Sequence, residues 1–92
     1  MRQSYLVTYD ISDPKRLARV ARVCEDHGDR IQNSVFECRL TPSDVIRLRA
    51  RLERTIDRAE DQVLIVRMGD GTERLESLGR AYEPLDRVAI IV

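Results

Sequence analysis

The chain has 92 residues, of which 42% are hydrophobic and 35% are charged, and its 16 basic and 16 acidic side chains balance. This length and composition are typical of one small globular domain over residues 1–92 and exclude a disordered chain. Zero net charge argues against a protein that coats DNA by charge alone, which would be strongly basic. No apolar run approaches the roughly 20 residues of a membrane span, and no signal peptide is recognisable. We therefore expect a cytoplasmic protein that makes no contact with a membrane.

The N-terminal part predicts a strand followed by a helix. Residues 5–10 predict the strand, because tyrosine, valine and threonine suit a pleated surface. The helix should span residues 14–27, with Asp13 as its N-cap and Pro14 at its first position. Its apolar stripe consists of Leu17, Val20, Ala21 and Cys24. Gly28 follows the helix, and we expect it in the left-handed conformation that commonly terminates helices.

The middle of the chain predicts two short strands and a second helix. The strands are expected near residues 30–33 and 35–40. The helix should begin at Pro42, because Thr41 is a favourable N-cap and Asp44 places an acid near the positive helix end. One face of this helix is apolar and contains Val45, Leu48, Leu52 and Ile56.

The C-terminal third contains one clear predicted strand and segments whose secondary structure is harder to predict. Residues 62–68 carry an apolar run and predict a strand, and the Gly-Asp-Gly sequence at 69–71 predicts a turn. Residues 73–87 are ambiguous, because a glycine and a proline within them oppose a long helix. The apolar run VAIIV at 88–92 predicts a final strand.

The expected order of elements is β-α-β-β-α-β with an extra C-terminal strand, which is an α+β, ferredoxin-like arrangement. Two helices can cover only one face of its antiparallel sheet. Apolar side chains occur at both parities of residues 5–10, which predicts that the second face is covered as well. The run at 88–92 is also too apolar for an uncovered edge. We therefore expect a homodimer, in which this terminal strand can join the other subunit's sheet.

Asp10 is the sharpest candidate for chemistry, because it places a carboxylate at the end of a predicted inner strand. Two interpretations are open. Aspartate is a common turn-former, and Asp13 caps a helix only three residues later. Aspartate is also a magnesium ligand, but a magnesium site needs several oxygen ligands and usually one or two carboxylates. A two-fold dimer would supply the second carboxylate from a second copy of Asp10.

Arginine supplies almost all of the positive charge. Outside the apolar stripe of the first predicted helix, three arginines recur at regular spacing: Arg16, Arg19 and Arg22. They form either a solvated charged face or a row of phosphate contacts. A second polar set alternates along the extended segment and consists of Arg30, Gln32 and Ser34. It would form a polar track, although ordinary strand patterning explains it equally well.

The other reactive or aromatic residues are expected to have structural roles. Cys24 and Cys38 fit no zinc or redox spacing, so we expect both to be buried as small hydrophobic side chains. Phe36 is expected in the core and His27 at the end of the first helix. A single histidine gives no basis for a hydrolytic triad, and no glycine-rich phosphate loop occurs.

A family resemblance covers nearly the whole chain and rests on three stretches: YLVTYDISDPKRLARVARVCEDHGDRIQNSVFE, ECRLTPSDV and SLGRAYEPLDRVAIIV. They resemble the CRISPR-associated endonuclease family of the second Cas protein, the small subunit of spacer acquisition. The most specific pieces are Tyr9-Asp10 and the RIQNSVFE block at 30–37. The resemblance implies a ferredoxin-like homodimer whose C-terminal strand joins the partner's sheet. It also implies that Asp10 is catalytic and, with its symmetry mate, binds a divalent metal such as Mg²⁺.

The same resemblance implies a function in CRISPR adaptation. Such proteins are described as metal-dependent endonucleases acting on RNA or double-stranded DNA. They also form the central, non-catalytic body of a complex with the CRISPR integrase subunit. The implied partners are therefore the integrase subunit, double-stranded DNA and single-stranded RNA. The implied nucleic-acid-binding residues are Arg16, Arg19, Arg30, Ser34 and Phe36.

Two other functions are compatible with the expected fold. One is a toxin-type endoribonuclease of similar fold, which the neighbouring genes would distinguish from a CRISPR subunit. The other is a non-enzymatic, ferredoxin-like regulatory module, which needs a glycine-lined interface pocket that the sequence does not offer. Among the CRISPR functions, we expect a structural role with the integrase in the cell, and nuclease activity that depends on conditions.

Overall fold

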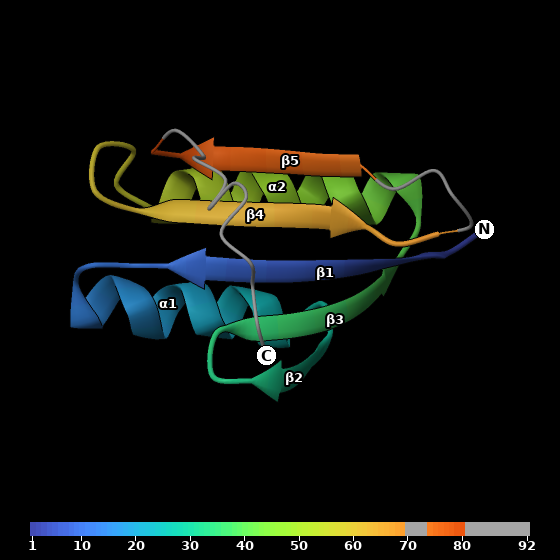
Figure 1. Ribbon diagram of the computed structural model, residues 1–92, viewed down its shortest axis with the longest axis horizontal. Coiled ribbons are helices and arrows are strands. Elements are labelled where there is room, and N and C mark those ends of the chain that lie inside the picture. The colour runs from blue at the N-terminus through green and yellow to red at the C-terminus, as the bar shows by residue number, and fades with distance from the viewer. Residues whose placement is uncertain (70–73, 81–92) are drawn as a thin grey trace, which may run out of the picture.

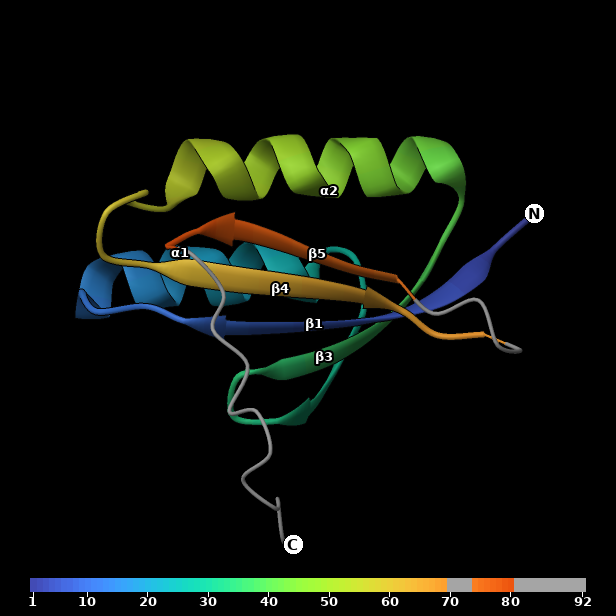
Figure 2. The ribbon, with the colours of Figure 1, turned by 45° about the horizontal axis from the view of Figure 1, so that its top comes forward.

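The computed structural model describes residues 1–69 and 74–80. They form one β-sheet with both helices packed on one of its faces (Figures 1 and 2). The elements in chain order are β1 (Gln3–Asp10), α1 (Pro14–Glu25), β2 (Asp29–Gln32), β3 (Val35–Leu40), α2 (Pro42–Thr55), β4 (Gln62–Arg67) and β5 (Arg74–Gly79). The predicted α+β, ferredoxin-like fold is confirmed. Both described helices lack the length and apolar character that a membrane crossing requires.

β1 is the central strand of the five-stranded antiparallel sheet, whose order is β2-β3-β1-β4-β5. The strand at 35–40 has the predicted boundaries, and those of the other three predicted strands within the described residues differ by at most two residues. The fifth strand, β5, arises within the segment at 73–87 that the sequence left ambiguous. The predicted strand at 88–92 and most of the predicted turn at 69–71 lie outside the described residues.

Both helices begin where their capping residues predict. The Asp13 carboxylate accepts a hydrogen bond of 2.9 Å from the backbone nitrogen of Arg16, at the start of α1. At the start of α2, Thr41 and Asp44 form a capping box, in which each side chain accepts a 3.1 Å bond from the other's backbone nitrogen. These bonds satisfy donors that a helix start would otherwise leave without partners.

The predicted left-handed conformation of Gly28 is wrong. α1 ends at Glu25, and in the described part of the chain Gly79 is the glycine with a positive φ, at 87°. Position 28 needs glycine for another reason, which is the close approach of the chain to β3. A Cβ there would lie 2.4 Å from the Cys38 Sγ and 2.4 Å from the Glu37 carbonyl oxygen.

The core lies between the helices and the sheet. Its buried apolar side chains are Val7, Tyr9, Val20, Val23, Cys24, Phe36, Cys38, Leu40, Leu48, Leu52, Val63, Ile65 and Leu78. The predicted stripe of α1 is wrong at Leu17, which is 40% exposed, and it omitted Val23, which is buried. The buried face of α1 is centred on Val20, Val23 and Cys24, so Leu17 lies at its margin.

Cys24 and Cys38 are free thiols within this core, as predicted. Burial raises the pKa of the Cys24 thiol to about 12 and that of the Cys38 thiol to about 11. Both therefore stay protonated and unreactive at neutral pH. The predicted position of His27 is confirmed as well, because its Nδ1 lies 3.0 Å from the Val23 carbonyl oxygen at the end of α1.

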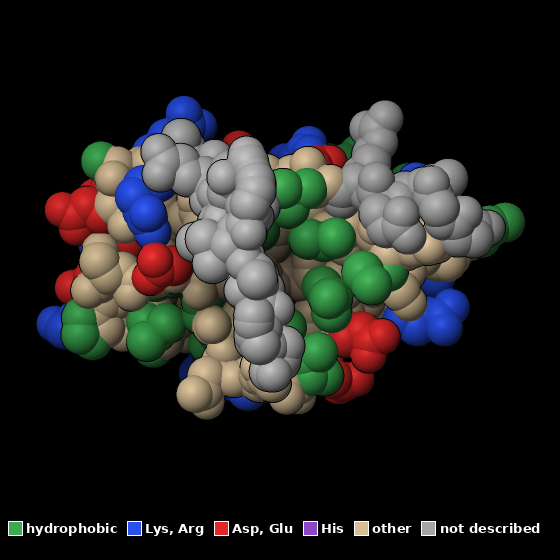
Figure 3. All heavy atoms as spheres, in the orientation of Figure 1, with side chains coloured by type: hydrophobic (Ala, Val, Ile, Leu, Met, Phe, Trp, Pro, Cys, Tyr) green, Lys and Arg blue, Asp and Glu red, His purple; other side chains and the backbone are tan. Residues whose placement is uncertain are grey.

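The opposite face of the sheet carries no helix of the described residues, and apolar side chains gather on it (Figure 3). The strand register places Leu6 beside Val66, and Val66 beside Leu75. Five apolar side chains on this side of the sheet form what we call the helix-free apolar face: Leu6, Val35, Leu64, Val66 and Leu75. Leu75 is 44% exposed and the other four are half-buried, so this face is only partly shielded from water.

Candidate active site

Asp10 is the last residue of β1, at one end of the central strand. Side chains alternate along a strand, so Asp10 points toward the helix-free face and away from buried Tyr9. Its backbone is held in the sheet opposite Gln62 of β4, and its side chain is 77% exposed. The predicted candidate is therefore an accessible carboxylate on a well-supported strand.

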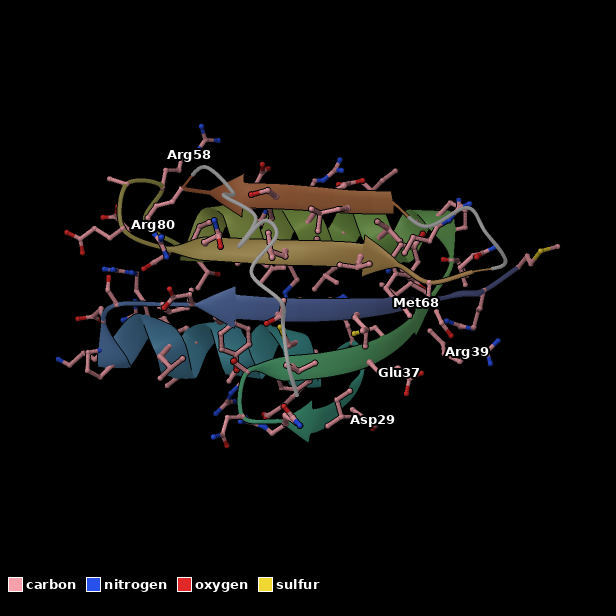
Figure 4. The ribbon with its side chains drawn as sticks, in the orientation of Figure 1. Asp29, Glu37, Arg39, Arg58, Met68 and Arg80 are labelled. Carbon is pink, nitrogen blue, oxygen red and sulfur yellow. The ribbon has the colours of Figure 1, made fainter. Side chains whose placement is uncertain are left out.

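Arg80 forms an ion pair with this carboxylate. Its Nη2 donates a hydrogen bond of 2.8 Å to the Asp10 Oδ2. The Arg80 Nε also donates to the Glu60 carbonyl oxygen at 3.0 Å, in the loop between α2 and β4. Figure 4 shows Arg80 at the end of the sheet where β1 ends and β4 begins. The positive charge of Arg80 is thus in direct contact with the Asp10 carboxylate, the candidate catalytic group.

Asp61 is a second carboxylate near this end of the sheet, and its side chain is fully buried. It accepts hydrogen bonds from the Arg16 Nε at 2.7 Å and from the backbone nitrogens of Ser12 and Asp57 at 3.1 and 2.8 Å. The Arg16 guanidinium is the largest of the influences that hold the pKa of Asp61 well below its usual range. Asp61 therefore joins the loop that follows Asp10 to the loop that follows α2.

The Arg16 side chain is part of this buried hydrogen-bond network. Its Nε and Nη2 both donate to the Asp61 carboxylate, and its side chain is only 22% exposed. The hydrogen bond to Asp61 is the main reason why the pKa of the Arg16 guanidinium is raised above its ordinary value. The residue supports the loops of the site from inside, and its predicted contact with nucleic acid stays a prediction.

Arg19 and Arg22 lie on the exposed side of α1, and neither forms an ion pair with a residue in the described ranges. Both guanidinium groups face solvent, where a phosphate could reach them. They belong to the helical layer, whereas the Asp10 side chain points to the other face of the sheet. The structure therefore does not bring these arginines together with Asp10 within one chain.

Arg30, Ser34 and Phe36 meet in the β2–β3 hairpin, beside the end of β1. The Ser34 carbonyl oxygen accepts a bond of 3.2 Å from the Tyr9 backbone nitrogen. The Arg30 guanidinium lies 5.0 Å above the Phe36 ring and donates to the Asn33 carbonyl oxygen at 2.8 Å. Phe36 is 0% exposed, so it supports Arg30 from below, and its own predicted contact with nucleic acid stays a prediction.

Comparison with known proteins decides the family. The family model described as CRISPR associated protein Cas2 matches residues 3–74. The chain belongs to the Cas2 family. A relative from Rhodospirillum rubrum, named CRISPR-associated endoribonuclease Cas2 1, is 41% identical over 97% of this chain and 90% of its own. A relative from Halalkalibacterium halodurans, named CRISPR-associated endonuclease Cas2, is 36% identical over 80% of this chain and 83% of its own.

The fold agrees with solved Cas2 structures. The crystal structure of Streptococcus pyogenes Cas2 matches with a TM-score of 0.68 at 41% identity, over 74% of this chain and 88% of that one. The resemblance in the sequence is thereby confirmed. Membership of the Cas2 family favours a CRISPR role over the toxin and the regulatory module that the fold alone left open.

The carboxylates of this Cas2-family chain can be compared with what Mg²⁺ requires. The described residues contain no cluster of three or more His, Cys, Asp or Glu side chains that could hold a metal ion. Asp61 is buried and its oxygens are taken up by protein donors, whereas Asp10 is exposed. Magnesium sites use one or two carboxylates completed by water and phosphate oxygens. Asp10 fits as one ligand of such a site, which a second copy of the chain would complete.

The sequence analysis did not identify two residues of the site, Asp61 and Arg80. Asp61 is an acid just before a strand, which is a common pattern, and its partner Arg16 is 45 positions away. Arg80 follows β5, in the segment whose secondary structure was ambiguous. The sequence contains several acidic residues at 57–61 and several arginines in the first helix, which suggests an ion pair between these segments. It does not show which two residues form the pair.

Proposed function

We propose that this chain is the subunit of CRISPR spacer acquisition that binds double-stranded DNA as a homodimer, together with the integrase subunit. The same dimer is a metal-dependent endonuclease that cuts phosphodiester bonds of RNA or DNA at Asp10. The family match and the names of the curated relatives support the CRISPR role and the nuclease activity. The observation that carries the site is the exposed Asp10 carboxylate at the end of the central strand.

The helix-free apolar face supports the dimer. Exposed apolar patches commonly mark interaction surfaces, and a chain this small leaves a large part of its surface in contact with water. In a two-fold dimer the same patch meets its own copy. Because Asp10 points to this face of the sheet, the dimer would bring two Asp10 carboxylates to one interface.

In this proposal, some residues of the chain hold the metal-binding carboxylate in place and others bind the nucleic acid. A magnesium ion held at Asp10 would activate water and polarise the phosphodiester. β1 fixes the Asp10 backbone, and the Asp61 network fixes the loop that follows it. Arg19, Arg22 and Arg30 would bind phosphates of the nucleic acid, since a planar guanidinium can donate to two phosphate oxygens at once.

Cleavage and spacer acquisition, measured with the same variants, test this proposal. Asp10→Asn should reduce Mg²⁺-dependent cleavage of RNA and duplex DNA by about 100-fold or more, a loss typical of removing a catalytic group. Asp29→Asn removes an exposed carboxylate from the edge strand β2 (Figure 4) and should leave cleavage unchanged. Cleavage that persists in Asp10→Asn would assign the activity to another site or to a contaminant.

In cells that carry the integrase and a repeat array, Asp10→Asn should retain spacer acquisition, because the cellular role is structural. Arg19→Glu should abolish acquisition and weaken duplex binding with a shallower salt dependence, because it removes a phosphate contact. Arg54→Glu reverses an exposed arginine of α2 and is the matched control. Acquisition lost in a folded Asp10→Asn dimer would contradict the structural role.

A further inference from the structure

The geometry points to Arg80 as a positioning residue that occupies the Asp10 carboxylate and competes with a divalent cation for it. This inference rests on the proposed cation site at Asp10. Within the described ranges, the bond from Arg80 Nη2 to Asp10 Oδ2 is the one hydrogen bond or ion pair of the Asp10 side chain. A cation that binds this oxygen must displace the guanidinium or share the oxygen with it.

Three bonds that do not involve Asp10 hold Arg80 in place. Its backbone nitrogen donates to the Asp61 carbonyl oxygen at 2.7 Å, and its carbonyl oxygen accepts from the Gln62 Nε2 at 3.3 Å. Its Nε donates to the Glu60 carbonyl oxygen at 3.0 Å. Because the guanidinium is planar, the Nε bond also fixes the direction of Nη2. These bonds to Glu60, Asp61 and Gln62 therefore aim Arg80 at Asp10.

The two arginine–aspartate pairs at this end of the sheet differ in exposure. Asp61 is fully buried against Arg16, so neither water nor a cation has access to its carboxylate. In the outer pair, the side chains of Asp10 and Arg80 are 77% and 39% exposed. Exposed ion pairs are weak and open readily. The inner pair is suited to fix the loops, and the outer pair is suited to exchange its partner.

Arg80 lowers the affinity of the site for a cation in two ways. It donates to one carboxylate oxygen, and its positive charge lies where a second positive charge has to enter. A two-fold dimer would place one such pair on each side of the shared site. The site would then remain without metal at low cation concentration and fill as the concentration rises, which makes nuclease activity conditional.

Titration of the purified protein with Mn²⁺, followed by electron paramagnetic resonance of the unbound ion, tests this inference. Arg80→Gln removes the charge and should bind Mn²⁺ about twofold to fivefold more tightly than the natural protein, the range for an exposed charge pair. Arg58→Gln removes the same charge from an exposed arginine at the same end of the molecule (Figure 4). Because Arg58 has no ion pair with a described residue, its variant should match the natural protein.

Asp10→Asn separates this inference from the function on which it rests. If Asp10→Asn binds Mn²⁺ as tightly as the natural protein, Asp10 is not the ligand, and both the cation site and the role of Arg80 are wrong. If Asp10→Asn loses binding while Arg80→Gln binds no more tightly than Arg58→Gln, only the role of Arg80 is overturned.

Ionic strength supplies a readout that a purely structural role of Arg80 would not change. The gain of Arg80→Gln over the natural protein should shrink as KCl rises from about 0.05 to about 0.5 M, since salt screens exposed pairs. A gain that is independent of salt would contradict competition by charge. If Arg80→Gln does not fold, Arg80→Met replaces it. Methionine has neither the positive charge nor the donors of the guanidinium, so Mn²⁺ affinity should still rise, and an unchanged affinity would overturn the inference.

Discussion

At the scale of single residues, burial distinguishes Asp61 from Asp10, although both lie at the same end of the sheet. Asp10 could be chosen from the sequence, because a strand pattern that stops at an aspartate is a local signal. Asp61 could not, since its importance comes from burial and from Arg16, which is 45 positions away. The same long-range contact gives Arg16 a structural partner that its helical spacing did not predict.

The buried pair leads to a prediction about stability. Asp61→Asn should lower the free energy of unfolding by about 1–3 kcal/mol, because it removes the closest charged partner of the partly buried Arg16 guanidinium. Urea unfolding at pH 7 measures this loss. Glu60→Gln is the comparison, since Glu60 pairs with Arg16 only at 3.7 Å and its side chain is 65% exposed, so its effect should stay below about 1 kcal/mol.

The pH dependence of the same measurement identifies the cause. The pKa of Asp61 is lowered in the folded protein, whereas an unfolded aspartate titrates near about 3.9. The stabilisation is therefore complete well above that unfolded pKa and is lost as the pH falls through it toward the folded pKa. Between about pH 5 and pH 2, stability should fall more steeply in the natural protein than in Asp61→Asn. Parallel curves would show that the ion pair is not the source of the stability.

At the scale of elements, local chemistry explains what could be predicted. The starts of α1 and α2 follow from Asp13 and Thr41, because each cap acts on backbone groups within one helical turn. β5 could not be assigned, because its strand conformation depends on pairing with β4 rather than on its own pattern. Tertiary packing likewise decided that Val23 rather than Leu17 faces the core.

Gly28 gives a test of packing between two elements. Gly28→Ala should destabilise the protein by about 1–3 kcal/mol, because its Cβ would overlap the Cys38 Sγ and the Glu37 carbonyl oxygen. Thermal unfolding of Gly28→Ala, Cys38→Ala and the double variant measures the coupling. The double variant should lose less than the sum of the single losses, since Cys38→Ala removes one of the overlapping atoms. Strict additivity would contradict this close contact.

At the scale of the whole molecule, the sheet has two apolar faces and the helices cover one of them. This could be predicted from residues 5–10, whose apolar side chains occur at both parities, and it is the basis of the dimer that we propose. The arrangement of the two copies in the proposed dimer depends on surfaces that no local pattern specifies. Their relation matters for function, because the proposed cation site takes one exposed Asp10 carboxylate from each copy.

In the proposed dimer, two copies of Asp10 form one cation site. Isothermal titration calorimetry with Mn²⁺, combined with light scattering to establish the dimer, tests it most directly. We expect one Mn²⁺ for every two chains, with binding abolished in an Asp10→Asn protein that remains dimeric. One Mn²⁺ per chain, or unchanged binding in the dimeric Asp10→Asn variant, would contradict the shared site.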